Sequence, residues 1–259
     1  MRLELTGKRA FVTGASGDIG RAICRLLARS GAQVAFAYFS DHDGARATAR
    51  ELAEIQAHPP EMLRVNFGDA HSTDTFIHEV QERFDCIDIL VHSAASGVFR
   101  GAPELTARHV QWAMDVNARS LLSLVQGLLK GSDERDPILR RGSSIVTLSS
   151  LGAVRAIPQY TALAASKAAL EAIARHLALE LGPKGIRVNV VSPGLVETRA
   201  LEHFPNRAHL VAVASGRTPL ARLTTPEDVA SVVGFLACDA ASMIHGQTIH
   251  VDGGYCIVG

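Results

Sequence analysis

The sequence predicts an α/β protein built on one doubly wound parallel sheet of about seven strands, with helices on both faces. Short runs of β-branched and apolar residues recur along the chain, and longer stretches in which apolar residues repeat with helical period separate most of them. The short runs are apolar almost throughout. That composition is typical of parallel strands covered on both faces.

Seven segments have the strand-like composition, namely residues 9–14, 32–38, 63–67, 87–94, 143–150, 186–194 and 247–254. The first intervening stretch, residues 19–31, shows the helical pattern, because Ile19, Ile23, Leu26 and Leu27 share one helix face. Neither a Pro/Gly/Ser-rich linker nor a repeat of fixed period divides the chain. We therefore expect a single domain over residues 1–259.

Composition excludes several classes of protein. The 26 basic residues balance the 26 acidic ones, so no net charge attracts the chain to nucleic acid or to an anionic membrane. We find no signal-peptide pattern at the N-terminus and no apolar run of the roughly 20 residues that a membrane helix needs. The four cysteines lack CxxC spacing and the histidines are dispersed, so we expect no disulfide framework and no metal. A cytoplasmic protein is the expectation.

The first strand-like segment ends in TGASGDIG, residues 13–20, directly before a helix. Glycines permit a tight turn and a close approach of backbone to a pyrophosphate, and the helix N-terminus attracts that anion. The sequence thus predicts Rossmann-like dinucleotide binding by Gly14, Ser16, Gly17, Asp18, Ile19 and Gly20; a tight connection without ligand is the alternative. Asp18 is unfavourable beside a pyrophosphate unless its side chain points away, where it could cap the helix.

The end of the second strand-like segment bears on the choice of cofactor. NAD-binding proteins usually carry an acid there, which accepts a hydrogen bond from the ribose 2′-hydroxyl. Tyr38 stands where we expect that acid, and Ser40 and His42 could contact a 2′-phosphate. Asp41 argues mildly the other way. We predict NADPH, with NADH as the alternative.

Together the motifs resemble the short-chain dehydrogenase/reductase family over essentially the whole chain. They are TGASGDIG (13–20), LVHSAASG (90–97), DVNARSLL (115–122), TLSSLGA (147–153), YTALAASK (160–167), VSPGLVET (191–198) and GQTIHVDGG (246–254). Tyr160 stands seven residues before Lys167, and the usual tyrosine position, four residues before the lysine, holds Leu163. This wider spacing resembles the enoyl-acyl-carrier-protein reductases. Residues 94–100, 200–207 and 243–254 most resemble their triclosan-tolerant L-type subgroup.

The wider spacing has a physical interpretation. On a helix, seven residues return to nearly the same face about 10 Å further along, and Lys167 leans toward the N-terminus and Tyr160. When hydride attacks Cβ of an α,β-unsaturated thioester, negative charge develops on an oxygen two bonds beyond the carbon attacked. We expect the stabilising hydroxyl to be displaced similarly. Tyr160 would stabilise the enolate and Lys167 would hold the nicotinamide ribose; the alternative is a loop tyrosine and a solvated lysine.

The resemblance assigns two further catalytic candidates, each with an alternative interpretation. Ser150 lies 17 residues before Lys167, where a catalytic serine is expected, although serine is common at strand ends. Asn117 would bind a water for proton relay or satisfy a helix carbonyl, and both interpretations remain open. The residue that protonates Cα is not identified.

The resemblance also implies the remaining cofactor contacts. Asn66 and Phe67 would flank adenine, whereas Ser93, Ala94 and Ala95 would lie against ribose, and Thr198 would bond the carboxamide. Lys167 would hold the nicotinamide ribose, and the other expected contacts are Pro193, Gly194 and Val196. His92 departs from the family, because an asparagine commonly bridges strand ends at that position.

Residues 199–225 precede Pro226 without a firm helix or strand prediction, and we interpret them as a substrate lid. Apolar Leu201, Phe204, Leu210 and Val213 would line an acyl channel or form ordinary lid core. Arg199 and Arg207 would meet a phosphopantetheine phosphate or be solvated.

The leading functional prediction is NAD(P)H-dependent reduction of an enoyl thioester in fatty-acid or related synthesis, with acyl carrier protein or coenzyme A as carrier. The first alternative is an NADPH-dependent ketoreductase acting on a β-ketoacyl or polyketide carbonyl. The second is a dinucleotide-binding regulator without turnover, which the missing tyrosine at position 163 suggests. The resemblance further implies a homotetramer.

Overall fold

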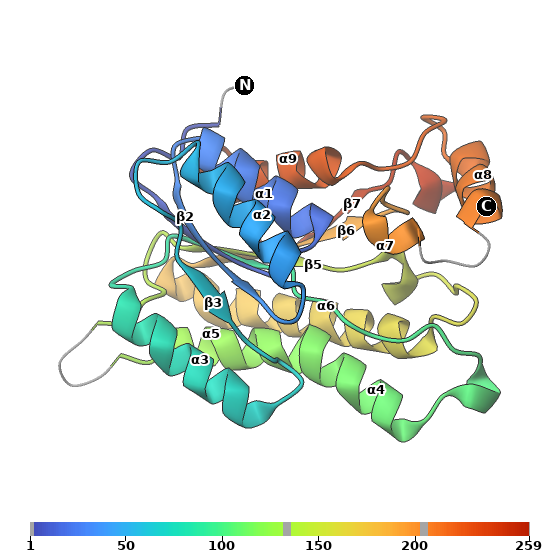
Figure 1. The fold of residues 1–259 in the computed structure, drawn as a ribbon, viewed down its shortest axis with the longest axis horizontal. Coiled ribbons are helices and arrows are strands. Elements are labelled where there is room, and N and C mark those ends of the chain that lie inside the picture. Colours follow the sequence, from blue (N-terminus) through green and yellow to red (C-terminus); the bar gives the residue numbers. More distant parts are fainter. Residues whose placement is uncertain (1–2, 132–135, 203–206, 259) are drawn as a thin grey trace.

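A computed structural model describes residues 3–131, 136–202 and 207–258. Within them a seven-stranded, all-parallel sheet of order β3-β2-β1-β4-β5-β6-β7 lies between two layers of helices (Figure 1). The strands are β1 (Arg9–Thr13), β2 (Gln33–Tyr38), β3 (Met62–Arg64), β4 (Ile89–His92), β5 (Ser144–Leu148), β6 (Arg187–Pro193) and β7 (Thr248–Val251). The predicted single doubly wound domain is confirmed.

Strand β3 differs most from its predicted range, because it ends at Arg64. Beyond it, the Asn66 side chain accepts the backbone N–H of Gly68 at 3.0 Å, and the Ser72 hydroxyl accepts that of Asn66 at 3.0 Å. These local bonds form a turn and replace further pairing with β2. Asn66 and Phe67 therefore lie in a loop beyond the strand.

One face of the sheet is covered by α1 (Asp18–Arg29), α2 (His42–Ala53) and α9 (Pro226–Ala237). The other carries α3 (Ala70–Arg83), α4 (Ala107–Met114), α5 (Ser120–Leu129) and α6 (Thr161–Leu181), as Figure 1 shows. In β4, Ile89 and Val91 pack into one core and Leu90 into the other. Consecutive residues of a strand thus serve opposite cores, which explains why the strand segments are apolar throughout.

Short helices and a π-helical turn complete the described chain. Turn η2 (Asp115–Arg119) joins α4 to α5. The 3-10 helices are η1 (Ala102–Glu104), η3 (Leu151–Ala153), η4 (Gly182–Lys184), η5 (Asp239–Ala241) and η6 (Tyr255–Ile257). No described helix is long and apolar enough to cross a membrane.

The segment after β6 contains two helices that the sequence analysis did not predict, α7 (Arg199–Glu202) and α8 (Arg207–Arg217). Glycine and two valines lower the helix propensity of α8, and Ala214 is its only buried residue among those the structure describes. An amphipathic period is therefore missing. Phe204 lies outside the described residues.

Strand order reverses between the neighbouring strands β1 and β4. In an open parallel sheet, ligands bind beyond the carboxyl ends of the strands at such a switch point. Residues that follow β1, β2, β4, β5 and β6 therefore surround one crevice.

Candidate active site

A cleft of about 970 Å³ opens beyond the carboxyl ends of the strands. It brings together most of the residues that the sequence analysis assigned to a site. The predicted cofactor contacts that line it are Gly14, Ser16, Gly17, Asp18, Ile19, Gly20, Ser40, Asn66, Phe67, Ser93, Ala94, Ala95, Lys167, Pro193, Gly194 and Thr198. Tyr160 and Ser150 line the same cleft.

Val196 and Asn117 do not line the cleft. Val196 is buried and forms an isolated parallel bridge with Thr224. The backbone N–H of Glu197 donates to the carbonyl of Thr224 at 3.0 Å. The bridge at Val196 thus connects the chain just before residues 199–225 to the end of that segment.

The loop between β1 and α1 is pressed against the end of β4. Gly14 has φ +71°, and a Cβ on it would stand 2.7 Å from the Cα of Ala94. The Thr13 hydroxyl oxygen accepts the backbone N–H groups of Ser93 and Ala94 at 3.2 and 3.1 Å. Gly17 is the N-cap of α1 and offers no side chain to its first N–H groups. This cradle suits a pyrophosphate, which would accept those N–H groups.

The side chain of Asp18 points away from the cradle and toward Arg199, the first residue of α7. The Arg199 Nε and backbone N–H groups donate to its two carboxylate oxygens at 2.8 and 2.7 Å. The Arg199 guanidinium also donates to the carbonyl of Ser16 at 3.1 Å and lies 3.7 Å from the Asp41 carboxylate. Asp18 does not cap α1. The two interpretations of Arg199 from the sequence were a solvated side chain and a contact with a phosphopantetheine phosphate. In the structure its guanidinium pairs with Asp18.

The end of β2 carries both acidic and neutral groups. The hydroxyl of Tyr38 lies 3.2 Å from Nδ1 of His42. Asp41 caps α2 by accepting the backbone N–H of Gly44 at 2.8 Å. Tyr38, Ser40 and Asp41 line the cleft, so a carboxylate stands at its adenosine end.

Tyr160 is the N-cap residue of α6, at the helix start that the sequence analysis expected. Its hydroxyl donates to the Ser150 hydroxyl oxygen at 3.1 Å, and its ring lies 5.7 Å from that of Phe99. A Cβ on Gly152 would stand 2.4 Å from the Tyr160 ring, so glycine leaves room for it. Burial raises the pKa of Tyr160, and the bond to Ser150 opposes this, so the phenol keeps its proton at neutral pH.

Lys167 is buried, which excludes the interpretation as a solvated lysine. Its Nζ donates to the carbonyl of Leu148, at the end of β5, at 2.7 Å. Burial lowers the pKa of Lys167 from 10.5 to about 8, and the charge of Glu171 opposes that fall. An ammonium has three hydrogens, so two remain for ligand groups in the cleft.

Leu163 occupies the position four residues before Lys167. It is buried and lines the cleft. A Cβ on Gly97 would stand 2.6 Å from the Leu163 Cγ, so the loop after β4 packs directly on this side chain. Tyr160, Leu163 and Lys167 therefore all line the cleft, and Leu163 stands between the other two in the sequence.

Comparisons with known proteins show the family to which the chain belongs. Residues 14–256 match the family model described as enoyl-(acyl carrier protein) reductase. The chain belongs to this family of short-chain dehydrogenases/reductases. A Synechocystis protein named enoyl-[acyl-carrier-protein] reductase [NADH] FabI is 35% identical, with 99% of each chain covered. A Streptomyces collinus protein named 1-cyclohexenylcarbonyl-CoA reductase is 33% identical, with 96% of this chain and 87% of that one covered.

A solved structure supports the same assignment. The enoyl-[acyl-carrier-protein] reductase (NADH) from Aquifex aeolicus VF5 has a TM-score of 0.87 at 30% identity, and 98% of each chain is covered. The chain is therefore an oxidoreductase of the enoyl reductase family that uses a nicotinamide cofactor. The finer resemblance to the L-type subgroup stays a prediction.

Within this reductase, Asn117 has a structural role that the sequence analysis did not foresee. Its Oδ1 accepts the backbone N–H of Ser96 at 2.9 Å. Its Nδ2 donates to the carbonyl of Ser96 at 2.9 Å and to the hydroxyl of Ser166 at 2.8 Å. Both amide hydrogens are thus used, and the side chain contacts neither a helix carbonyl nor the cleft. Asn117 clamps the loop after β4 to α6.

His92 supports the turn that carries Asn117. Its Nε2 lies 2.8 Å from the Ser120 hydroxyl, which itself donates to the carbonyl of Val116 at 2.6 Å. Nε2 must therefore carry the ring proton, and Nδ1 has no partner in the described structure. Burial lowers the pKa of His92 from 6.5 to about 3, and the charge of Lys167 adds to this. The imidazole is neutral at pH 7.

Sequence reasoning missed Trp112 and Glu171. Trp112 lines the cleft, donates from Nε1 to the Ser96 hydroxyl at 2.9 Å and covers Gly68, where a Cβ would meet its ring at 2.2 Å. Glu171 is buried and accepts from the Ser149 hydroxyl at 2.5 Å. An acid four residues after Lys167 on one helix face was the available signal.

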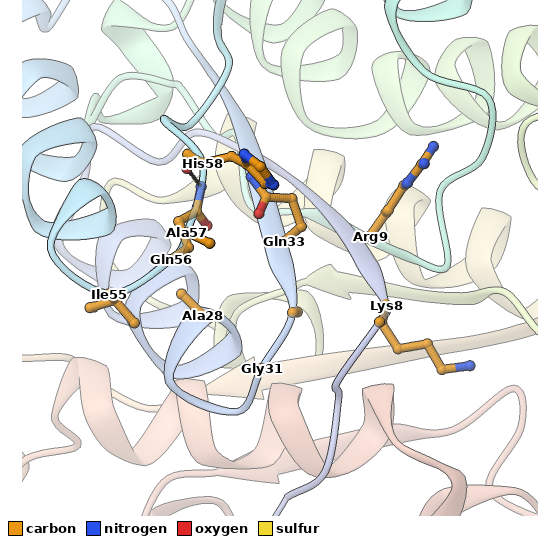
Figure 2. A pocket seen from close by; sticks show the side chains of 11 residues that line it. Lys8, Arg9, Ala28, Gly31, Gln33, Ile55, Gln56, Ala57 and His58 are labelled. Atoms are coloured by element: carbon orange, nitrogen blue, oxygen red, sulfur yellow. Dashed lines mark hydrogen bonds between the residues drawn. The ribbon is translucent and has the colours of Figure 1, made fainter.

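A second hollow, of about 470 Å³, lies near the amino ends of β1 and β2. Figure 2 shows the Lys8 and Arg9 side chains extending away from Gln33 and His58. Gln56 is engaged with the backbone of Val34, accepting at 3.0 Å and donating at 3.2 Å. The residues that line this hollow do not bring a hydrogen-bond donor and a general base together, as a catalytic site would require.

Proposed function

We propose that this protein reduces the carbon–carbon double bond of an enoyl thioester during acyl-chain synthesis. The observation that carries the proposal is the joint presence of the Tyr160 hydroxyl and the buried Lys167 ammonium in one cleft, with Leu163 at the closer position. Membership of the enoyl reductase family supports it.

The chemistry divides between cofactor and protein. A reduced nicotinamide bound in the cleft would supply hydride to Cβ of the substrate. The cradle around Gly14 and Gly17 would hold its pyrophosphate, and Lys167 would hold its ribose with the two hydrogens not donated to Leu148. Tyr160 moves its hydrogen bond from Ser150 to the thioester oxygen, where negative charge develops as the enolate forms. Because the phenol stays protonated, it acts as a hydrogen-bond donor rather than as a base, and a proton added to Cα of the enolate completes the reduction.

We propose NADH as the reductant, although the sequence analysis favoured NADPH. Asp41 stands at the adenosine end of the cleft, and Asp18 adds a second carboxylate beside it that Arg199 pairs. A 2′-phosphate would be repelled by the excess negative charge. The Synechocystis and Aquifex relatives carry NADH in their names.

The substrate is proposed to reach the nicotinamide under the lid at residues 199–225. Leu201 is buried, whereas Leu210 and Val213 are 37% and 41% exposed, and we propose that this exposed pair contacts the acyl chain. We propose acyl carrier protein as the carrier, with coenzyme A as the alternative that the name of the Streptomyces relative supports. A homotetramer in the cytoplasm completes the proposal.

The decisive measurement follows oxidation of NADH and NADPH with crotonyl and acetoacetyl thioesters of acyl carrier protein and of coenzyme A. We expect turnover of the crotonyl thioester with NADH. Turnover of acetoacetyl thioester alone would identify a ketoreductase. Dinucleotide binding without turnover of either substrate would identify a regulator.

A further inference from the structure

Glu171 is a buried carboxylate that the proposed chemistry leaves without a role. The Ser149 hydroxyl donates to its Oε1 at 2.5 Å. Such a short distance is typical of a hydroxyl bonded to an ionised carboxylate. Burying a charged group costs free energy, so we expect the Glu171 carboxylate to interact with a group of opposite charge.

Lys167 and Glu171 lie one helical turn apart on α6 and are anchored to consecutive residues of one strand end. Lys167 donates to the carbonyl of Leu148, and Glu171 accepts from Ser149. Residues four apart on a helix share a face, so the two charges are held in a fixed relation. In the described structure they form no direct ion pair, and two of the three ammonium hydrogens are left for ligands.

The other titratable groups named around Lys167 do not cancel the negative charge of Glu171. His92 on β4 is neutral at pH 7, and Tyr160 at the start of α6 keeps its proton. In the π-helical turn packed on α6, the Asp115 carboxylate is paired with Arg119 at 3.2 Å. Among these described groups, Glu171 alone contributes an unpaired negative charge.

We propose that Glu171 is a positioning residue whose negative charge keeps Lys167 protonated in the cleft, while Ser149 holds Glu171 in place. The inference rests on the proposed role of Lys167 in holding the nicotinamide ribose. Burial lowers the pKa of Lys167 to about 8, and Glu171 limits that fall. Removing the charge therefore makes Lys167 lose its proton at a lower pH.

The protonation of Lys167 can be measured directly, because the chain contains only four lysines, Lys8, Lys130, Lys167 and Lys184. Selective ¹³C-labelling of lysine gives four side-chain NMR signals, and Lys167→Arg identifies the relevant one. In Glu171→Gln, which keeps the shape, we expect the Lys167 titration midpoint to fall by about one pH unit. Glu171→Asp should restore most of it, and Glu180→Gln, an exposed acid on the same helix, should leave it unchanged.

An unchanged Lys167 midpoint in folded Glu171→Gln overturns the proposal. If that variant does not fold, Ser149→Ala takes its place; a fall smaller than one unit supports the proposal, and an unchanged midpoint overturns it. The alkaline limit of enoyl-thioester reduction should shift with the NMR midpoint. Because the titration needs no substrate, its outcome stands even if the enoyl thioester is not turned over.

Discussion

Tyr160 is the N-cap residue of the long helix α6, and its hydroxyl is directed to Ser150 rather than along the helix face. This placement separates the hydrogen-bond donor from the ammonium of Lys167 without removing either from the cleft. In the absence of substrate, the Tyr160 hydroxyl donates its hydrogen to Ser150, and a stronger acceptor can replace Ser150 in this bond. An enolate oxygen is such an acceptor because a charged partner strengthens a hydrogen bond.

We predict that Tyr160→Phe lowers kcat for crotonyl-thioester reduction about a hundredfold, because one donor to the developing oxyanion is lost. KM should change little, since the bond forms mainly in the transition state. The measurement is steady-state NADH oxidation. Tyr255→Phe, a matched change at the C-terminal end, should keep full activity. Full activity in Tyr160→Phe would remove that residue from the mechanism.

The lid and the dinucleotide loop are joined by the first residue of α7. Arg199 bonds Asp18 through both its guanidinium and its backbone N–H. An acid in the loop is tolerated because this arginine neutralises it. The two residues are 181 positions apart in the sequence, and we predict that their pairing couples the segment after β6 to dinucleotide affinity.

Arg199→Ala should therefore raise the Kd for NADH about tenfold, because it leaves the Asp18 carboxylate uncompensated near the pyrophosphate. The double variant Asp18→Ala/Arg199→Ala should recover most of the affinity. Fluorescence of Trp112, the only tryptophan and part of the cleft wall, reports binding. Arg46→Ala, an exposed arginine on α2, is the control. Additive losses in the double variant would contradict the pairing.

His92, at the end of β4, predicts acid sensitivity. The unfolded imidazole takes up a proton near pH 6.5, whereas the folded pKa is about 3. The unfolded state thus binds more protons between these values, and the free energy of unfolding should be full above pH 6.5 and decrease as pH falls toward 3. Urea unfolding at pH 7.5 and pH 5 measures this. His92→Asn should reduce the dependence, and an unaltered slope would refute the assignment.

For the molecule as a unit, sequence patterns predicted the sheet because its inner strands, such as β4 and β5, are buried on both faces and are therefore mostly apolar. They did not predict α8, whose residues are mostly exposed and follow no helical period. They suggested that an Asp18 side chain turned away from the cradle could cap α1, whereas it pairs with Arg199, which only the complete fold brings to it. Asn117 was recognised from its motif, whereas its clamp on Ser96 depends on a π-helical turn that no local pattern indicates.

The homotetramer proposed above needs an apolar surface, and apolar side chains are exposed at one edge of the molecule. Leu179 on α6 and Met243 before β7 are 76% and 93% exposed. His245 ties the two segments together, with Nε2 2.7 Å from the carbonyl of Ala178. Strand β7 is an edge strand, so this region favours association of subunits.

We expect light scattering to give the mass of a tetramer, and Leu179→Glu/Met243→Glu to give a smaller species, because the introduced charges would be buried without partners. Met62→Glu, on the opposite edge strand β3, should leave the mass unchanged. A monomeric wild-type protein, or a double variant of unaltered mass, would contradict the proposed interface.

The contact between Leu163 and Gly97 bears on how such reductases diverge. A tyrosine at position 163 would have to pack against the backbone after β4 or extend into the cleft, and that backbone is fastened through Ser96 to Asn117. We therefore expect an exchange of alkene for carbonyl specificity to involve changes in both the loop and the helix. Single substitutions along such a route would pass through proteins with neither arrangement intact, so the two specificities are expected to interconvert rarely during evolution.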